Sequence, residues 1–234
     1  LPADLIGTMI FNQKDGSFVP RKGPVFSNIV LADEINRAPA KVQSALLEAM
    51  EEKQVTVEGA TRALPLPFFV IATQNPHDQL GTYALPESQL DRFLMRIELG
   101  YPDRAAERTL LATGGQRSQA DALPCLLSPT DLPAIQGRVA AVHTAAPLID
   151  YVQALLEATR HDPAFQHGLS PRAGLALLSA ARAWAWLDGR DMVIPDDVQA
   201  VLPAVARHRL RTAQQGGNAQ AEDITRLLRS VAIP

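Results

Sequence analysis

The chain has 234 residues, of which 47% are hydrophobic and 20% are charged, which is typical of a globular protein with one large core or two modest ones. No apolar run reaches the about 18 residues that indicate a membrane span, and the N-terminus lacks a signal-peptide pattern, so we expect a cytoplasmic protein without a membrane partner. The net charge of −3 argues against nucleic acid as a partner.

The order of strand-like and helix-like segments predicts an α/β part followed by an all-α part. We expect the α/β domain at residues 1–113, a linker at residues 114–127 and a helical domain at residues 128–234. The linker contains two adjacent glycines and a polar run. Cys125, the single cysteine, lies among apolar residues, so we expect its thiol to be buried or half-buried.

Two hairpins are expected in the first part because each has a glycine-containing turn between strand-like runs. Their strands are residues 9–11 with 18–19 and residues 55–57 with 62–64. Residues 28–32 and 68–72 are short apolar runs, typical of strands buried on both faces of a parallel sheet. Between them, apolar residues at helical spacing follow Pro39 and predict an amphipathic helix.

Proline placement supports the helical interpretation of the second part. A proline is favoured at the first position of a helix, and a preceding serine is able to cap it. We therefore expect helices to begin at Ser128-Pro129, Ser170-Pro171 and Ile194-Pro195. Gly189 is placed to end the helix that carries both tryptophans.

Two adjacent carboxylates, Asp33 and Glu34, follow the first apolar strand. Ligands bind at the carboxyl ends of strands in open α/β sheets. Phosphoryl transfer needs a carboxylate for Mg²⁺ and a group that activates or orients the attacking water. These residues suit both roles, although two acids at a strand end are also common in a solvated turn.

Three further polar residues are candidates for the same chemistry. Asn75 follows the second apolar strand, where it could bind a phosphate or water, although Asn-Pro is also an ordinary turn signal. Arg92 ends a short helix at residues 85–93, either in a weak surface ion pair or available to a partner. Arg172 lies in the first turn of a capped helix, where the helix dipole disfavours a cation unless an anion such as a phosphate is near.

Together these features resemble the MoxR family, in the helix-2-insert branch of AAA+ ATPases that also contains the magnesium chelatase ATPase subunit and the MCM helicases. The similarity covers nearly the whole chain and includes residues 23–28, 32–38, 43–50, 159–160 and 208–210. It implies an AAA+ P-loop-type parallel sheet sandwiched by helices, followed by an all-α lid domain.

The resemblance also implies a role for each candidate. Asp33 would hold Mg²⁺ and Glu34 would activate water as the Walker B pair, and Asn75 would be sensor 1. Arg92 would be the arginine finger, offered to ATP on a neighbouring subunit, with Arg96 as the fallback. Arg172 would be sensor 2, and the two hairpins would belong to the surfaces with which this branch remodels clients.

The sequence departs from the family pattern at one point, because it contains no Gly-x-x-x-x-Gly-Lys-Ser/Thr loop. That loop cradles the phosphates of the nucleotide. We expect it, with the preceding strand, N-terminal to Leu1, so the sheet described by these residues would be incomplete. The chain by itself is therefore expected to bind ATP poorly.

The resemblance thus predicts an ATP- and Mg²⁺-dependent ATPase that forms a homo-oligomeric ring, a hexamer in the manner of the family, and remodels or matures protein complexes. Its expected partners are a protein client and a protein with a von Willebrand factor A domain. Two alternatives remain open from the sequence. One is a non-catalytic interaction module derived from such an ATPase, and the other is a nucleic-acid motor of the same branch.

Overall fold

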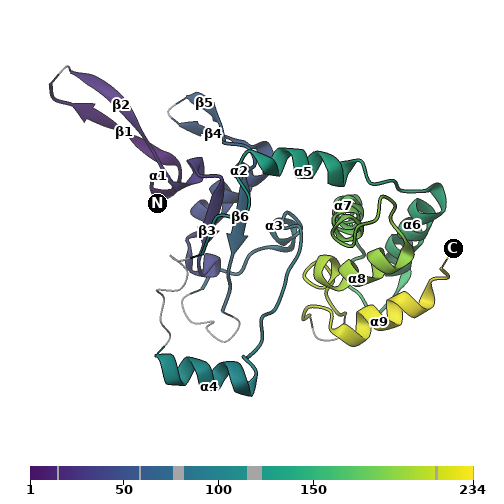
Figure 1. Cartoon of the computed structure of the whole chain (residues 1–234). Helices are drawn as coiled ribbons and strands as arrows, with labels where there is room; N and C mark the ends of the chain where they lie inside the picture. The colour runs from purple at the N-terminus through teal and green to yellow at the C-terminus, as the bar shows by residue number, and fades with distance from the viewer. Residues whose placement is uncertain (15, 58, 76–81, 115–122, 214–215, 234) are drawn as a thin grey trace. The chain divides into compact units, whose positions relative to one another are not determined.

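The protein is described by a computed structural model that covers residues 1–14, 16–57, 59–75, 82–114, 123–213 and 216–233. These residues form two compact units, 1–94 and 95–234 (Figure 1). The division therefore falls before the linker expected at residues 114–127, most of which lies outside the described residues. Helix α4 (Arg104–Thr113), just before that segment, buries none of its residues.

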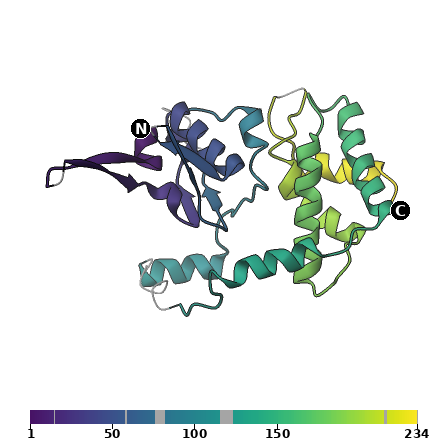
Figure 2. The same cartoon turned by 90° about the horizontal axis from the view of Figure 1, so that it is seen from above.

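The first unit contains the two expected hairpins. After the short helix α1 (Pro2–Ile6), strands β1 (Gly7–Asn12) and β2 (Ser17–Lys22) pair antiparallel. Phe11 lies opposite Phe18 on the exposed hairpin, and their ring centroids are 5.2 Å apart. Strands β4 (Gln54–Val57) and β5 (Ala60–Ala63) form the second antiparallel pair. The β1–β2 hairpin projects from the first unit in Figure 1 and in Figure 2, and the β4–β5 hairpin projects from it in Figure 1.

The two apolar runs form the expected parallel pair. Strands β3 (Ile29–Ala32) and β6 (Phe69–Ala72) align with Ile29 opposite Phe69 and Ala32 opposite Ala72. The expectation that both faces are buried is wrong for the described residues. Side chains alternate between faces, and only the face with Val30 and Val70 packs into the core. The other face is exposed, with Ile29, Leu31, Phe69 and Ile71.

Helix α2 (Ala40–Glu52) contributes Leu46, Leu47 and Ala49 to the core beneath that sheet face. Pro39 is its N-cap residue, so the helix begins where the sequence indicated. Two short 3₁₀ turns, η1 (Pro24–Phe26) and η2 (Ile35–Arg37), flank β3. The buried apolar residues of this core are Val25, Val30, Ile35, Leu46, Leu47, Ala49, Val55, Leu64, Phe68 and Leu85.

The second unit is helical, as expected. Its helices after α4 are α5 (Asp131–Ala140), α6 (Ala146–His161), α7 (Pro171–Leu187), α8 (Pro195–Ala206) and α9 (Ala221–Ser230). Helix α7 packs against α5, α6 and α8, and α9 packs against α6 and α8 (Figure 1). The core between them is built from aliphatic and alanine side chains with Tyr151 and Phe165.

Two of the three expected helix starts are confirmed, at Pro171 and Pro195. The third is wrong, because α5 begins at Asp131, after Thr130. There the Asp131 carboxylate accepts a hydrogen bond from the Ser128 amide at 2.8 Å, so the Ser-Pro pair belongs to the turn before the helix. Cys125 also differs from expectation, because it is exposed; its thiol donates to the Leu127 carbonyl at 3.3 Å.

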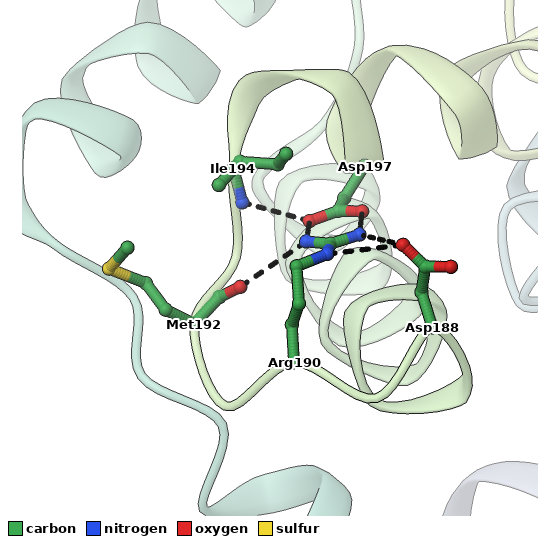
Figure 3. A network of polar contacts seen from close by, with 5 residues as sticks. All are labelled: Asp188, Arg190, Met192, Ile194 and Asp197. Atoms are coloured by element: carbon green, nitrogen blue, oxygen red, sulfur yellow. Dashed lines mark hydrogen bonds and ion pairs between the residues drawn. The ribbon is translucent and has the colours of Figure 1, made fainter.

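The loop between α7 and α8 is fixed by one polar cluster (Figure 3). Arg190 donates to both carboxylate oxygens of Asp197, at 2.6 Å from Nη1, and also to Asp188. Asp197 is almost fully buried, at 1% exposure. Its carboxylate also accepts the Ile194 amide, at 2.8 Å, which caps the first turn of α8. Among the helices in the described parts of the chain, none is long and apolar enough to span a lipid bilayer.

Candidate functional site

The carboxyl ends of β3 and β6 place three of the candidate residues, Asp33, Glu34 and Asn75, at one edge of the sheet. Asp33 and Glu34 directly follow β3, and Thr73 and Asn75 follow β6. Because the two strands are parallel and in register, these residues emerge at the same edge of the sheet. This edge is where open α/β sheets bind ligands.

Thr73 contacts both acidic residues. Its hydroxyl donates to Asp33 Oδ1 at 2.6 Å and accepts the backbone amide of Glu34 at 2.8 Å. Its carbonyl accepts the amide of Ile35 at 3.0 Å, and its own amide donates to the Ala32 carbonyl at 3.1 Å. Sequence reasoning gave Thr73 no role. The available signal was a hydroxyl residue at the end of a strand that runs parallel to the acidic strand.

Glu34 has an unusual backbone conformation. Its φ of 48° and ψ of 53° lie in the left-handed region, which costs a non-glycine residue about 1–2 kcal/mol. Such outliers gather at functional sites, where surrounding contacts hold them. The Glu34 side chain pairs with Arg37, with 2.7 Å between Oε2 and Nε, and both side chains are about half exposed.

A buried amide fixes the turn after the acidic pair. Gln43 on α2 is 1% exposed, and its Nε2 donates to the carbonyls of Ile35 and Tyr83, at 3.1 Å each. The Tyr83 amide in turn donates to the Asn36 carbonyl. The sequence predicted Gln43 on a helix within the family pattern. Its position on that helix did not reveal that its side chain links η2 to the segment before α3 (Glu87–Leu90).

Arg92 lies two residues after α3 and is bound within its own unit. Its Nη1 is 2.8 Å from Glu51 Oε2 on α2 and 3.4 Å from the Leu47 carbonyl. The guanidinium side chain is still one-third exposed, at 33%. The fallback residue, Arg96, belongs to the second unit, where its Nη2 is 3.1 Å from Glu98 Oε1.

Arg172 is exposed in the first turn of α7, in the second unit. The Ser170 hydroxyl caps this helix by accepting the Ala173 amide at 3.1 Å. The turn before it is held from α6, because the buried Thr159 hydroxyl accepts the Leu169 amide and Arg160 Nε donates to the Leu169 carbonyl. The expected capped helix start with an arginine in its first turn is therefore present.

The carboxylates suit Mg²⁺ held together with a nucleotide better than a metal held by protein alone. Among the described residues, no group of three or more His, Cys, Asp or Glu side chains is arranged to bind a metal ion. Mg²⁺ usually takes one or two protein carboxylates and completes its shell with waters and substrate phosphates. Asp33, exposed at the sheet edge with one oxygen bound to Thr73, fits that pattern.

Comparison with known proteins shows the family of the chain. The ATPase family associated with various cellular activities (AAA) matches residues 1–95, and the AAA lid domain matches residues 157–228. The protein MoxR of Paracoccus denitrificans is 32% identical over 90% of this chain and 68% of its own length. The chain belongs to the MoxR family of AAA+ ATPases. The AAA match ends beside the boundary between the two compact units.

Two further comparisons extend over the whole chain. Chaperone MoxR1 of Mycobacterium tuberculosis is 44% identical over the full chain, which spans 65% of that relative. The crystal structure of a Cytophaga hutchinsonii protein is 41% identical and superposes with a TM-score of 0.90, covering all of this chain and 74% of the other. The similarity therefore covers the AAA+ α/β domain and the helical lid alike.

Proposed function

We propose that this MoxR-family protein hydrolyses ATP with Mg²⁺ and uses the reaction to remodel or mature protein complexes in the cytoplasm. The observation that carries the proposal is the placement of Asp33 and Glu34 at the carboxyl end of β3, with Thr73 and Asn75 at the adjacent end of β6. Phosphoryl transfer requires such positioned charges more than covalent chemistry by the protein.

Asp33 is proposed to hold Mg²⁺, either directly or through water. Its Oδ1 atom is oriented by the Thr73 hydroxyl, and a carboxylate has lone pairs left for further partners. When bound, Mg²⁺ would offset the negative charge of the β- and γ-phosphates.

Glu34 is proposed to accept a proton from the attacking water, and Asn75 to orient that water. The Glu34 carboxylate is paired with Arg37. An ion pair at this exposure contributes at most about 1 kcal/mol, so exchange of Arg37 for water requires little energy. Glu34 can therefore change partners without any rearrangement of the fold.

Arg92 is proposed as an arginine finger for a neighbouring subunit, and Arg172 as a sensor that binds nucleotide from the lid. Arg92 is one-third exposed, and its contact with Glu51 is of the weak surface type. These roles imply a homo-oligomeric ring, which we propose to be a hexamer. Arg96 is the second candidate for the finger.

A protein client is the proposed substrate of the ring, and a protein with a von Willebrand factor A domain is a proposed partner. The name of Chaperone MoxR1 supports a chaperone-like role.

The test is Mg²⁺-dependent ATP turnover by the protein made from its complete coding sequence. Glu34→Gln should retain ATP binding and lose turnover, because an amide does not accept the proton of the attacking water. Glu48→Gln, on the exposed face of α2, is the matched control and should hydrolyse ATP normally. Normal turnover by Glu34→Gln would remove Glu34 from the base role, and a wild-type protein without ATP binding would favour the interaction module.

A further inference from the structure

We propose that Thr73 is a positioning residue for ATP hydrolysis, which holds the carboxylate of Asp33 and the backbone of Glu34 in their working arrangement. The inference rests on the proposed function of those two residues. Thr73 would contact neither nucleotide nor metal in this role and would act through its two acidic neighbours.

The Thr73 hydroxyl uses its hydrogen-bonding capacity in two directions. A hydroxyl has one hydrogen to donate and two lone pairs to accept with. Since the Glu34 amide is necessarily a donor, the hydroxyl accepts there, at 2.8 Å, and directs its hydrogen to Asp33 Oδ1, at 2.6 Å. The second distance is in the range of charge-assisted O–H···O⁻ bonds, which are about twice as strong as neutral ones.

The backbone of Thr73 completes the link between the two strands. Its amide binds the Ala32 carbonyl and its carbonyl accepts the Ile35 amide, so contacts of one residue span the whole acidic turn. Thr73 therefore fixes the left-handed conformation at Glu34, whose cost is about 1–2 kcal/mol.

Threonine suits this position better than other residues of its size. Its branched Cβ restricts χ1, so the hydroxyl remains directed at Asp33 and Glu34. Valine would preserve the shape but leave the Glu34 amide, which is partly buried, without this acceptor. Serine would keep the hydroxyl with more rotational freedom.

The experiment compares Thr73→Val, Thr73→Ser and wild type in the protein made from its complete coding sequence. We expect Thr73→Val to lower kcat by about tenfold to a hundredfold, equivalent to about 1.4–2.7 kcal/mol, and to raise the Mg²⁺ concentration needed for half-maximal activity. Its KM for ATP should change much less, because the residue does not contact nucleotide. Thr73→Ser should recover most of both losses.

The controls separate positioning from general stability. Thr225→Val removes an exposed threonine hydroxyl from α9, where it donates to the Ala221 carbonyl of its own helix, and should match wild type. If Thr73→Val does not fold, Thr73→Ala against Thr73→Ser provides the same comparison. A folded Thr73→Val protein with wild-type kcat and Mg²⁺ dependence would overturn the positioning role of Thr73 and leave the proposed function intact. A wild-type protein that does not hydrolyse ATP would overturn the proposed function and this inference together.

Discussion

The guanidinium of Arg190 lies across the buried carboxylate of Asp197 and donates to both of its oxygens (Figure 3). Burial alone raises the pKa of the Asp197 carboxyl. Hydrogen bonds from Arg190 and the Ile194 amide, together with the positive charge of Arg190, outweigh that effect and lower this pKa below its ordinary value. The contact joins the loop after α7 to the first turn of α8.

Asp197→Asn should therefore destabilise the helical lid in a pH-dependent way. A carboxyl with a pKa lowered by folding stabilises the protein above its unfolded pKa, about 3.9, and this contribution is lost as pH falls through the folded value. The stability gap between wild type and Asp197→Asn should be largest near neutral pH and should close as pH falls below about 4.

Denaturation followed by tryptophan fluorescence will measure that gap, because Trp184 and Trp186 both lie on α7. Asp196→Asn, on the exposed side of the same turn, is the control and should change little. A gap that does not vary between pH 7 and pH 3 would show that the charge of Asp197 does not stabilise the lid.

Gln43→Leu should destabilise the first unit by about 2 kcal/mol. A leucine has a similar volume but removes the Gln43 donor from the carbonyls of Ile35 and Tyr83. The Ile35 carbonyl keeps the Ala38 amide, whereas the Tyr83 carbonyl loses this donor, and a buried acceptor without a partner costs about 1–3 kcal/mol. Both tryptophans are in the second unit, so amide hydrogen exchange along α2 is the suitable measurement. Gln54→Leu, exposed on β4, is the control and should leave the exchange rates unchanged. If the amides of α2 exchange as slowly in Gln43→Leu as in wild type, these hydrogen bonds do not stabilise the unit.

Residues 1–234 by themselves should bind ATP weakly or not at all, because they contain no P-loop and this loop supplies the principal phosphate contacts of related sites. Isothermal titration calorimetry of MgATP into this 234-residue chain provides the measurement. Tight Mg²⁺-dependent binding would show that another part of the chain holds the phosphates.

Arg92→Ala in the protein from the complete coding sequence should bind ATP and hydrolyse it slowly. An arginine finger contributes on the order of 10³ to 10⁵ in rate in other phosphoryl-transfer systems. Arg92→Ala and Glu34→Gln subunits, each with little or no activity alone, should regain part of the activity when mixed, because some interfaces then pair an intact Glu34 with an intact Arg92.

The mixing experiment is a titration at fixed total protein, performed after subunit exchange has been demonstrated. An arginine that acts within its own subunit would produce no recovery. A flat, inactive profile in exchanging mixtures would therefore eliminate Arg92 as a finger in trans and move attention to Arg96.

The sequence by itself determined the local elements of this protein. The apolar runs of β3 and β6, the glycine turns of the hairpins and the prolines that start α7 and α8 act over a few residues, so their signals are readable in order along the chain. The position of Asp33 and Glu34 at a strand end follows from the same local pattern. Local signals failed at Ser128-Pro129, where a turn hydrogen bond competes with helix initiation.

Only the tertiary structure decided which side chains meet. Thr73 and Asp33 are 40 residues apart, and their contact depends on the parallel register of β3 with β6. The pairing of Arg92 with Glu51 likewise depends on how α2 packs beside the segment after α3. A hydrogen bond or ion pair requires two groups within about 3 Å of each other, a condition set by packing and register rather than by either residue's neighbours in the chain.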